Sequence, residues 1–222
     1  MKNNSNIIKA LFFISIILPS NAYTESFTDS FESGDLSAPN GHGFKWAADN
    51  ARTGVVKQSR KNSADDSYSL QFTYPKGLFN SERRFDMGKS YSDLWIQYWL
   101  RVPTNFKHNS SSPSNNKLFS IWMDDYSSKG DGPTVIWEFW QQNNGGSELA
   151  VHFSQGGFTA AGAHKQRKPF ITFPDDQGRW MNIVLHVKAA TSDTANNGVI
   201  EMWRKWEGEG GFTKFHEIID AN

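Results

Sequence analysis

The sequence predicts an all-β fold, a sandwich or a barrel. Short apolar or alternating runs recur along the chain, and clusters of Gly, Asn, Asp, Ser and Pro separate them. This spacing is typical of all-β domains, whose strands are short and joined by turns. Helical periodicity is weak throughout. We therefore expect one domain that consists of strands and turns.

The apolar runs predict nine strands after residue 50. Each is bounded by turn-forming residues, and none of the intervening segments is long enough to be an interdomain linker. The expected strands are Gly54–Ser59, Ser69–Tyr74, Leu94–Val102, Lys117–Met123, Thr134–Trp140, Glu148–Ser154, Trp180–Lys188, Val199–Trp206 and Phe212–Ile219.

Alternation along these strands separates a core face from a wetter face, because neighbouring side chains on a strand point to opposite sides of the sheet. In Leu94–Val102, Ile96, Tyr98, Leu100 and Val102 form the core face. Trp95, Gln97, Trp99 and Arg101 form the opposite face. Glu148–Ser154 and Trp180–Lys188 alternate in the same way. The pattern favours a sandwich with one dry interface and one face of aromatics, amides and histidines, which suits a sugar chain.

Composition narrows the class of protein. The 222 residues are 14% aromatic and include no cysteine, with 23 basic and 23 acidic residues. The aromatic content indicates a packed core, and the lack of cysteine excludes disulfides, Cys-ligated metals and thiol nucleophiles. Balanced charge argues against nucleic acid as a partner, so any anionic partner must meet a local basic patch. Glycine loops for nucleotides are missing from the sequence.

The N-terminus predicts export. Lys2 and Lys9 flank a polar start, Ala10–Leu18 is an apolar run, and small residues precede a cleavage point after Ala22. These are the three parts of a secretory signal peptide. We expect a leader over residues 1–22 and a domain over residues 23–222, located in the periplasm or the medium. No other run is apolar enough to span a bilayer, and cleavage removes two lysines, which makes the mature chain slightly acidic.

Several segments resemble one family of secreted sandwiches. Asp29–Ser37 is similar to the opening strand and turn, Ser81-Glu-Arg-Arg-Phe85 to an Arg/Glu motif, and Trp95–Pro103 to the aromatic strand that follows it. Gly178–Lys188 with Asn197–Trp203 is similar to a late strand pair. Together they resemble the concanavalin A-like jelly-roll polysaccharide lyases, such as heparin lyase, glucuronan lyase and alginate lyase. The resemblance implies a two-sheet antiparallel jelly roll.

The sequence departs from that family in two places. The matching inner strand, Lys117–Asp125, lacks the Gln and His that such lyases carry two residues apart. The chain also stops at Asp220-Ala-Asn222, directly after an expected strand, whereas these domains usually close with further strands. The resemblance therefore implies that the sequence is a C-terminally truncated jelly roll, and it leaves the catalytic base to be assigned from this chain's own residues.

The resemblance implies β-elimination on an acidic, uronate-containing glycan. This chemistry needs a group that neutralises the carboxylate, a base for the C5 proton and an acid for the leaving oxygen. The base is His152 or His186; we favour His152, because a Gly-Gly turn and the basic run His164–Lys168 follow its strand. The remaining catalytic candidates are Gln97 and Arg101, with Arg84, for the carboxylate, and Tyr98, Tyr126 or Lys117 for the proton.

Further side chains are expected to bind the glycan or a metal ion. Aromatic rings stack on sugar faces, and cations attract uronates. The expected binding residues are Trp95, Trp99, Arg84, Lys117, His186, Lys165 and Arg167. Asp124, Asp125 and Asp131 could supply oxygen ligands to a structural Ca²⁺, although their spacing fits no EF-hand loop. No other cofactor is expected, and the oligomeric state is open.

Three functions remain open on the sequence alone. The first is a polysaccharide lyase, favoured by the basic run and the polar-aromatic strand. The second is a non-catalytic carbohydrate-binding or lectin-like jelly roll, favoured by the missing Gln and His. The third is a structural surface or adhesion module. A retaining glycosidase is disfavoured, because Glu138 stands alone on its strand and such enzymes need two carboxylates.

Overall fold

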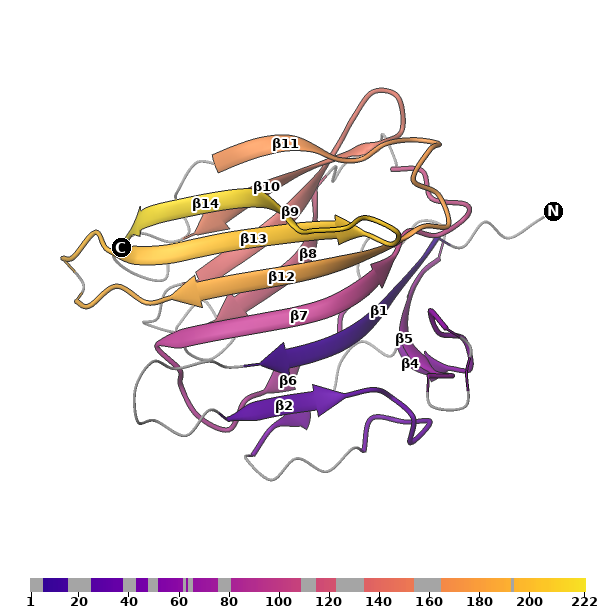
Figure 1. Cartoon of the computed structure of the whole chain (residues 1–222), viewed down its shortest axis with the longest axis horizontal. Helices are drawn as coiled ribbons and strands as arrows, with labels where there is room; N and C mark the ends of the chain where they lie inside the picture. The colour runs from indigo at the N-terminus through magenta and orange to yellow at the C-terminus, as the bar shows by residue number, and fades with distance from the viewer. Residues whose placement is uncertain are drawn as a thin grey trace. The chain divides into compact units, whose positions relative to one another are not determined.

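A computed structural model shows that the described part of the chain consists of strands and turns. It describes residues 6–15, 25–37, 43–47, 52–61, 63, 66–75, 81–108, 115–122, 134–153, 165–192 and 194–222. No helix occurs within these ranges, and none of them could therefore cross a membrane as a helix. The antiparallel sheets confirm the predicted all-β class and are consistent with a jelly-roll sandwich (Figure 1).

The strands form one large sheet, one four-stranded sheet and one short ribbon. The large sheet runs β14-β13-β12-β7-β1-β5-β4, with β2 paired to β1; the four-stranded sheet runs β11-β10-β9-β8; the ribbon pairs β3 with β6. The strands are β1 (Asn6–Ser15), β2 (Ser26–Asp29), β3 (Lys45–Trp46), β4 (Thr53–Val56), β5 (Ser69–Tyr74), β6 (Phe85–Asp86), β7 (Asp93–Arg101), β8 (Asn115–Trp122), β9 (Thr134–Gln141), β10 (Ser147–Phe153), β11 (Lys165–Ile171), β12 (Trp180–Lys188), β13 (Gly198–Trp206) and β14 (Thr213–Ala221).

By its internal contacts the chain divides into two compact units. The first comprises residues 1–105, 177–186 and 202–215, and the second comprises residues 106–176, 187–201 and 216–222. All of the four-stranded sheet belongs to the second unit. The polar-aromatic side of β7 belongs to the first.

Each of the nine predicted strands is present. β5 and β12 coincide with the predicted bounds, and the other seven differ from them by a few residues at their ends. Alternation on β7 is also confirmed. Leu94, Ile96, Tyr98 and Leu100 are buried, while the residues between them are half-buried.

Two segments that the sequence assigned elsewhere are strands. Residues of the apolar leader form β1, which pairs with β2, β5 and β7. Lys165–Lys168 of the basic run lie in β11, an edge strand of the four-stranded sheet. Charged residues and proline suit an edge strand, because they discourage pairing with a further chain. No strand was predicted over Lys165–Ile171, so β11 is an addition to the nine predicted strands.

Candidate functional site

The register of the four-stranded sheet brings an acid and a histidine to one face. Glu138 on β9 lies directly opposite Lys117 on β8 and Ala150 on β10. Ile136, two residues before Glu138, lies opposite His152. Directly opposed residues share a face, as do residues two apart on a strand. Glu138, Lys117 and His152 therefore project from the same side of this sheet.

We call this side the Glu138 face. The same pairing adds residues from all four strands, and Arg167 joins them through its contacts with Trp140 and Glu148. The residues of the Glu138 face are Lys117, Ser120, Trp122, Thr134, Ile136, Glu138, Trp140, Glu148, Ala150, His152 and Arg167.

Glu138 and His152 form an acid-imidazole pair on this face. Nδ1 of His152 lies 4.0 Å from Oε1 of Glu138, and the two side chains are 15% and 6% exposed. The separation is that of an ion pair and is longer than a hydrogen bond. A carboxylate at this place can orient an imidazole and stabilise it once it has taken a proton. The pair therefore has the parts of a general base.

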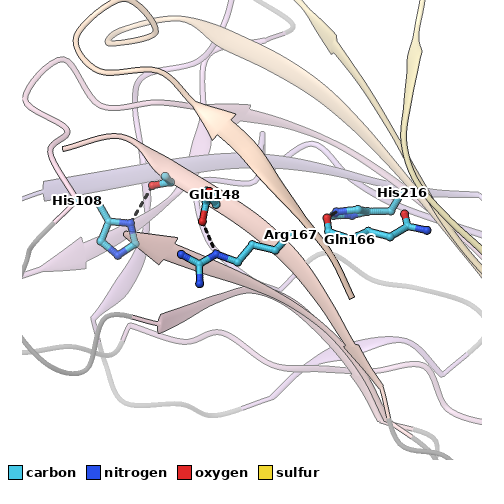
Figure 2. A network of polar contacts seen from close by, with 6 residues as sticks. His108, Glu148, Gln166, Arg167 and His216 are labelled. Carbon is cyan, nitrogen blue, oxygen red and sulfur yellow. Dashed lines mark hydrogen bonds and ion pairs between the residues drawn. The ribbon is translucent and has the colours of Figure 1, made fainter. Parts of the chain in front are cut away.

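Two cations flank the pair, each beside an aromatic ring. Nζ of Lys117 lies 5.7 Å from the centre of the Trp122 ring. The guanidinium carbon of Arg167 lies 4.9 Å from the centre of the Trp140 ring, and Nε of Arg167 donates to Glu148 (Figure 2). Both distances are within the range of cation–π attraction. The face thus places positive charge beside aromatic rings.

Lys165, the other predicted binding residue on β11, lies away from this face. Its Nζ is 5.4 Å from the centre of the Phe153 ring. Phe153 follows His152 on β10 and is buried, so it points to the opposite side of the sheet. The structure therefore separates Lys165 from Arg167, although only one residue lies between them.

A second histidine, His108, has a structural place in the same unit. Nδ1 of His108 and Oγ of Ser147 are 2.9 Å apart, and both side chains are buried (Figure 2). The backbone N–H of His108 also donates to the carbonyl of Gly145. These bonds hold the segment after β7 against the start of β10, and they place His108 outside the Glu138 face.

The predicted sugar-stacking residues Trp95 and His186 contact each other in the first unit. Their rings stack with centres 3.9 Å apart, and Trp95 also stacks on Trp203 at 5.5 Å. Nε2 of His186 lies 3.0 Å from Oδ1 of Asp93. Much of the ring surface of Trp95 is therefore used within the protein. This arrangement argues against sugar stacking on Trp95 and against His186 as the base.

The other predicted residues of β7 also have protein partners. Nε2 of Gln97 donates to Oδ1 of Asn182 at 3.0 Å, and Nε of Arg101 donates to the carbonyl of Gly178 at 3.3 Å. The guanidinium of Arg60 covers the Trp99 ring at 4.2 Å. These contacts cross-link β7 to β12 and to the segment before β5, which is a stabilising role.

Arg84 belongs to the first unit as well, and the two arginines of the Ser81–Phe85 motif have different roles. Arg83 is the inward member, because Nε donates to Oγ1 of Thr53 and Nη1 to the carbonyl of Ala47. Arg84 pairs with Glu82 and is 43% exposed. Arg83 therefore anchors the motif, and Arg84 faces outward.

The prediction that Tyr98 is a proton donor is wrong. It is 1% exposed and lies on the core face of β7, opposite in parity to Gln97 and Arg101. Burial raises the pKa of its hydroxyl far above the usual range. A substrate cannot reach the hydroxyl on this side of the strand, so the structure contradicts this prediction.

The calcium prediction falls on Asp124, Asp125 and Asp131, which lie outside the described residues, as does Tyr126. Within the described ranges, no group of three or more acidic or histidine side chains is placed to hold a metal ion. Within these ranges, the buried Asp176 accepts a hydrogen bond from the backbone of Thr172 at 2.8 Å. Its role is to close a turn.

Comparison with protein families decides the class. The sequence model of a family described as polysaccharide lyase matches residues 31–214, most of the chain and all of the Glu138 face. The chain belongs to this polysaccharide lyase family. No curated protein and no solved structure matches it. Family membership indicates a polysaccharide substrate and a polysaccharide-cleaving function.

Sequence reasoning missed several residues of the lyase's candidate site, Glu138 and Trp140 among them. Glu138 was considered only as half of a glycosidase pair, and Trp140 was not singled out. The signal was present in the hairpin from β9 to β10, because pairing across the turn at residues 142–146 places Glu138 beside Ala150 and near His152. Finding it required the register of the hairpin, which alternation within one strand does not provide.

Proposed function

We propose that this lyase is a secreted enzyme that cleaves an acidic, uronate-containing glycan by β-elimination. The observation that carries the proposal is the Glu138–His152 pair, with Lys117 and Arg167 on the same face. A polyuronate needs a base, positive charge and apolar ring surface at one place. The Glu138 face contributes all three.

In the proposed reaction, His152 takes the proton from C5 of a uronate residue. Nδ1 of His152 is directed at Glu138, so Nε2 is the nitrogen that faces the substrate. The carboxylate of Glu138 stabilises the imidazolium that forms. Electrons of the broken C5–H bond pass through an enolate and form a double bond between C4 and C5. The C4–O bond breaks, and the leaving oxygen takes a proton.

The two cations take the remaining roles. Arg167 binds the uronate carboxylate, which makes the C5 proton more acidic and stabilises the enolate. Lys117 lies opposite Glu138 and is exposed, so it can donate the proton to the leaving oxygen. We assign no metal or cofactor to the reaction.

Product analysis tests this proposal. The purified protein is incubated with alginate, glucuronan and glycosaminoglycans, and the ultraviolet absorbance of the unsaturated uronate is followed. Incubation in H₂¹⁸O, with mass spectrometry of the products, separates elimination from hydrolysis, because elimination adds no water. A rise in absorbance without ¹⁸O at the cleaved bond supports the proposal. Saturated products without the absorbance, heavier by one water than the unsaturated ones, would overturn it.

A binding module without activity is the second outcome, favoured by the missing Gln and His of β8. It would show retardation in gels containing an acidic glycan, with no unsaturated product from any substrate. Lys117→Ala and Lys165→Ala form a matched pair of variants, since only Lys117 lies on the Glu138 face. Loss of turnover in K117A alone supports the assigned face.

Secretion is tested on the expressed full chain. We expect the exported protein to begin at Tyr23, which intact-mass measurement or N-terminal sequencing detects. Such cleavage would release β1 from β5 and β7. Recovery of the full-length mass from the medium or periplasm would contradict the predicted leader.

A further inference from the structure

Gln166 has an unusual backbone conformation at the start of β11. Its φ is 52°, in the left-handed region that few residues other than glycine, asparagine and aspartate adopt. The pairing of β10 with β11 is also irregular here, with a shift in register between Leu149 and Val151. Such bulges redirect a side chain and are common beside active sites. The backbone is therefore held in an energetically unfavourable conformation immediately before Arg167.

Three hydrogen bonds hold Gln166 against β14. Its side-chain amide donates to the carbonyl of Glu217 and accepts from the backbone N–H of Glu217 at 3.0 Å. Nε2 of His216 donates to the backbone carbonyl of Gln166 at 3.0 Å (Figure 2). The amide of one side chain thus pairs with both backbone groups of a single residue. We call this arrangement the Gln166 clasp.

Arg167, the next residue, is directed to the Glu138 face. Nε donates to Glu148, and the guanidinium lies over Trp140. The side chain is 44% exposed. A guanidinium has five N–H donors in a planar fork, and the bond to Glu148 uses only Nε. The Nη edge can therefore take a carboxylate by two parallel hydrogen bonds.

We propose that Gln166 is a positioning residue, and that its clasp holds Arg167 to bind the carboxylate of a uronate residue. This inference rests on the proposed function, because it names the group of the substrate that Arg167 recognises. Lys165, before the clasp, lies over Phe153 on the other side of the sheet. At the clasp, the side chains of Lys165 and Arg167 point to different sides of the sheet. Arg167 is the one that lies on the Glu138 face, where the substrate would bind.

If the clasp acts through Arg167, its removal should change the kinetics in a specific way. Gln166→Gly removes the amide and accepts the left-handed φ without strain. We expect Q166G to lower kcat/KM for a uronate polymer about tenfold, through a higher KM and a lower kcat together, because Arg167 both binds the carboxylate and stabilises the enolate. R167A should lower kcat/KM by at least as much. On a carboxyl-reduced, neutral polymer, all three proteins should bind equally.

A double-mutant cycle separates positioning from a general structural role. If Gln166 acts only through Arg167, the variant with both Q166G and R167A should have the same kcat/KM as R167A alone. Independent, additive effects on kcat/KM would overturn the proposal, as would a kcat/KM of Q166G equal to that of wild type. Q166N is the second variant: asparagine accepts the left-handed φ but is one methylene too short for the clasp, so it should behave as Q166G does. Gln71→Ala, on β5, is the matched control and should leave KM unchanged.

The clasp has a readout that does not depend on turnover. The amide N–H of Glu217 donates to Gln166, so its hydrogen exchange should be slow in wild type and faster in Q166G and Q166N. If the wild-type protein makes no unsaturated product, the proposed function fails. The same cycle is then measured as the dissociation constant for alginate in affinity gels. Non-additive weakening supports the clasp, and equal retardation of all variants overturns it.

Discussion

Nδ1 of His152 lies 4.0 Å from Oε1 of Glu138, across two adjacent strands of the four-stranded sheet. The carboxylate is almost completely buried, whereas the imidazole retains some exposure on the same face. A buried charge is stable only with a partner, and an exposed imidazole edge is what a base needs. The pair therefore stabilises the buried carboxylate of Glu138 and leaves His152 placed to act as a base.

His152→Gln should abolish turnover without unfolding the protein. General base catalysis typically contributes about 10² to 10⁴ in rate, and glutamine cannot take the proton. Initial rates of unsaturated uronate formation give the loss, and near-ultraviolet circular dichroism reports on the fold. His108→Gln tests a histidine of the same unit outside the Glu138 face and should leave kcat near wild type. Full activity in H152Q would remove His152 from the site.

Glu138→Gln should lower kcat by about tenfold or more, because oriented charge next to a catalytic imidazole can be worth several kcal/mol. Glutamine has the same shape and no charge, so the packing on β9 is kept. The measurement is kcat and KM on the same substrate, with thermal unfolding as the check on stability. We expect KM to change little. An unchanged kcat would show that Glu138 is only a packed strand residue.

Alternation predicted the strands and their faces well because burial on one side of a sheet leaves a period of two in the sequence. It placed Tyr98 among the core residues of β7, and the structure agrees. The proton-donor role given to the same residue conflicted with that placement. A side chain cannot lie on the core face and also contact a substrate on the other, so parity was the better guide.

Pairing between strands could not be predicted in the same way. The Glu138–His152 pair depends on the register of β9 against β10, which the turn at residues 142–146 sets. The chain reverses there with Gly145 at a φ of 93°, which a side chain would strain. The strand β11 was missed for another reason: its Lys, Arg and Pro residues are characteristic of loops and equally of edge strands.

Trp95→Ala should lower stability and leave substrate binding unchanged. The ring stacks on both His186 and Trp203, so its removal takes packing from the large sheet. Large-to-small changes at buried aromatic residues cost about 3 to 5 kcal/mol, and this half-buried ring should be at or below the lower end. Denaturant unfolding measures the change, and KM checks the binding. A raised KM at unchanged stability would restore the sugar-stacking role that the sequence suggested.

The imidazole of His216 should make the protein less stable in mild acid. It is 1% exposed, and burial, with the nearby charge of Lys168, lowers its pKa from 6.5 to about 4 despite hydrogen bonds to the backbone of Gln166 and Leu149. Between these two values the unfolded chain binds a proton that the folded protein does not. The free energy of unfolding should therefore fall as pH drops from about 6.5 to about 4, by on the order of 3 kcal/mol from this group.

Comparison with His216→Asn isolates this contribution from that of the carboxylates, which lose their charge at similar pH. Asparagine has an N–H for the carbonyl of Gln166 but does not titrate. Urea unfolding of both proteins at several pH values gives the two slopes. We expect the wild type to lose more stability than H216N between pH 6.5 and 4, with little difference in slope above pH 7. Parallel curves over the whole range would show that the ring is protonated as readily in the folded protein as in the unfolded chain.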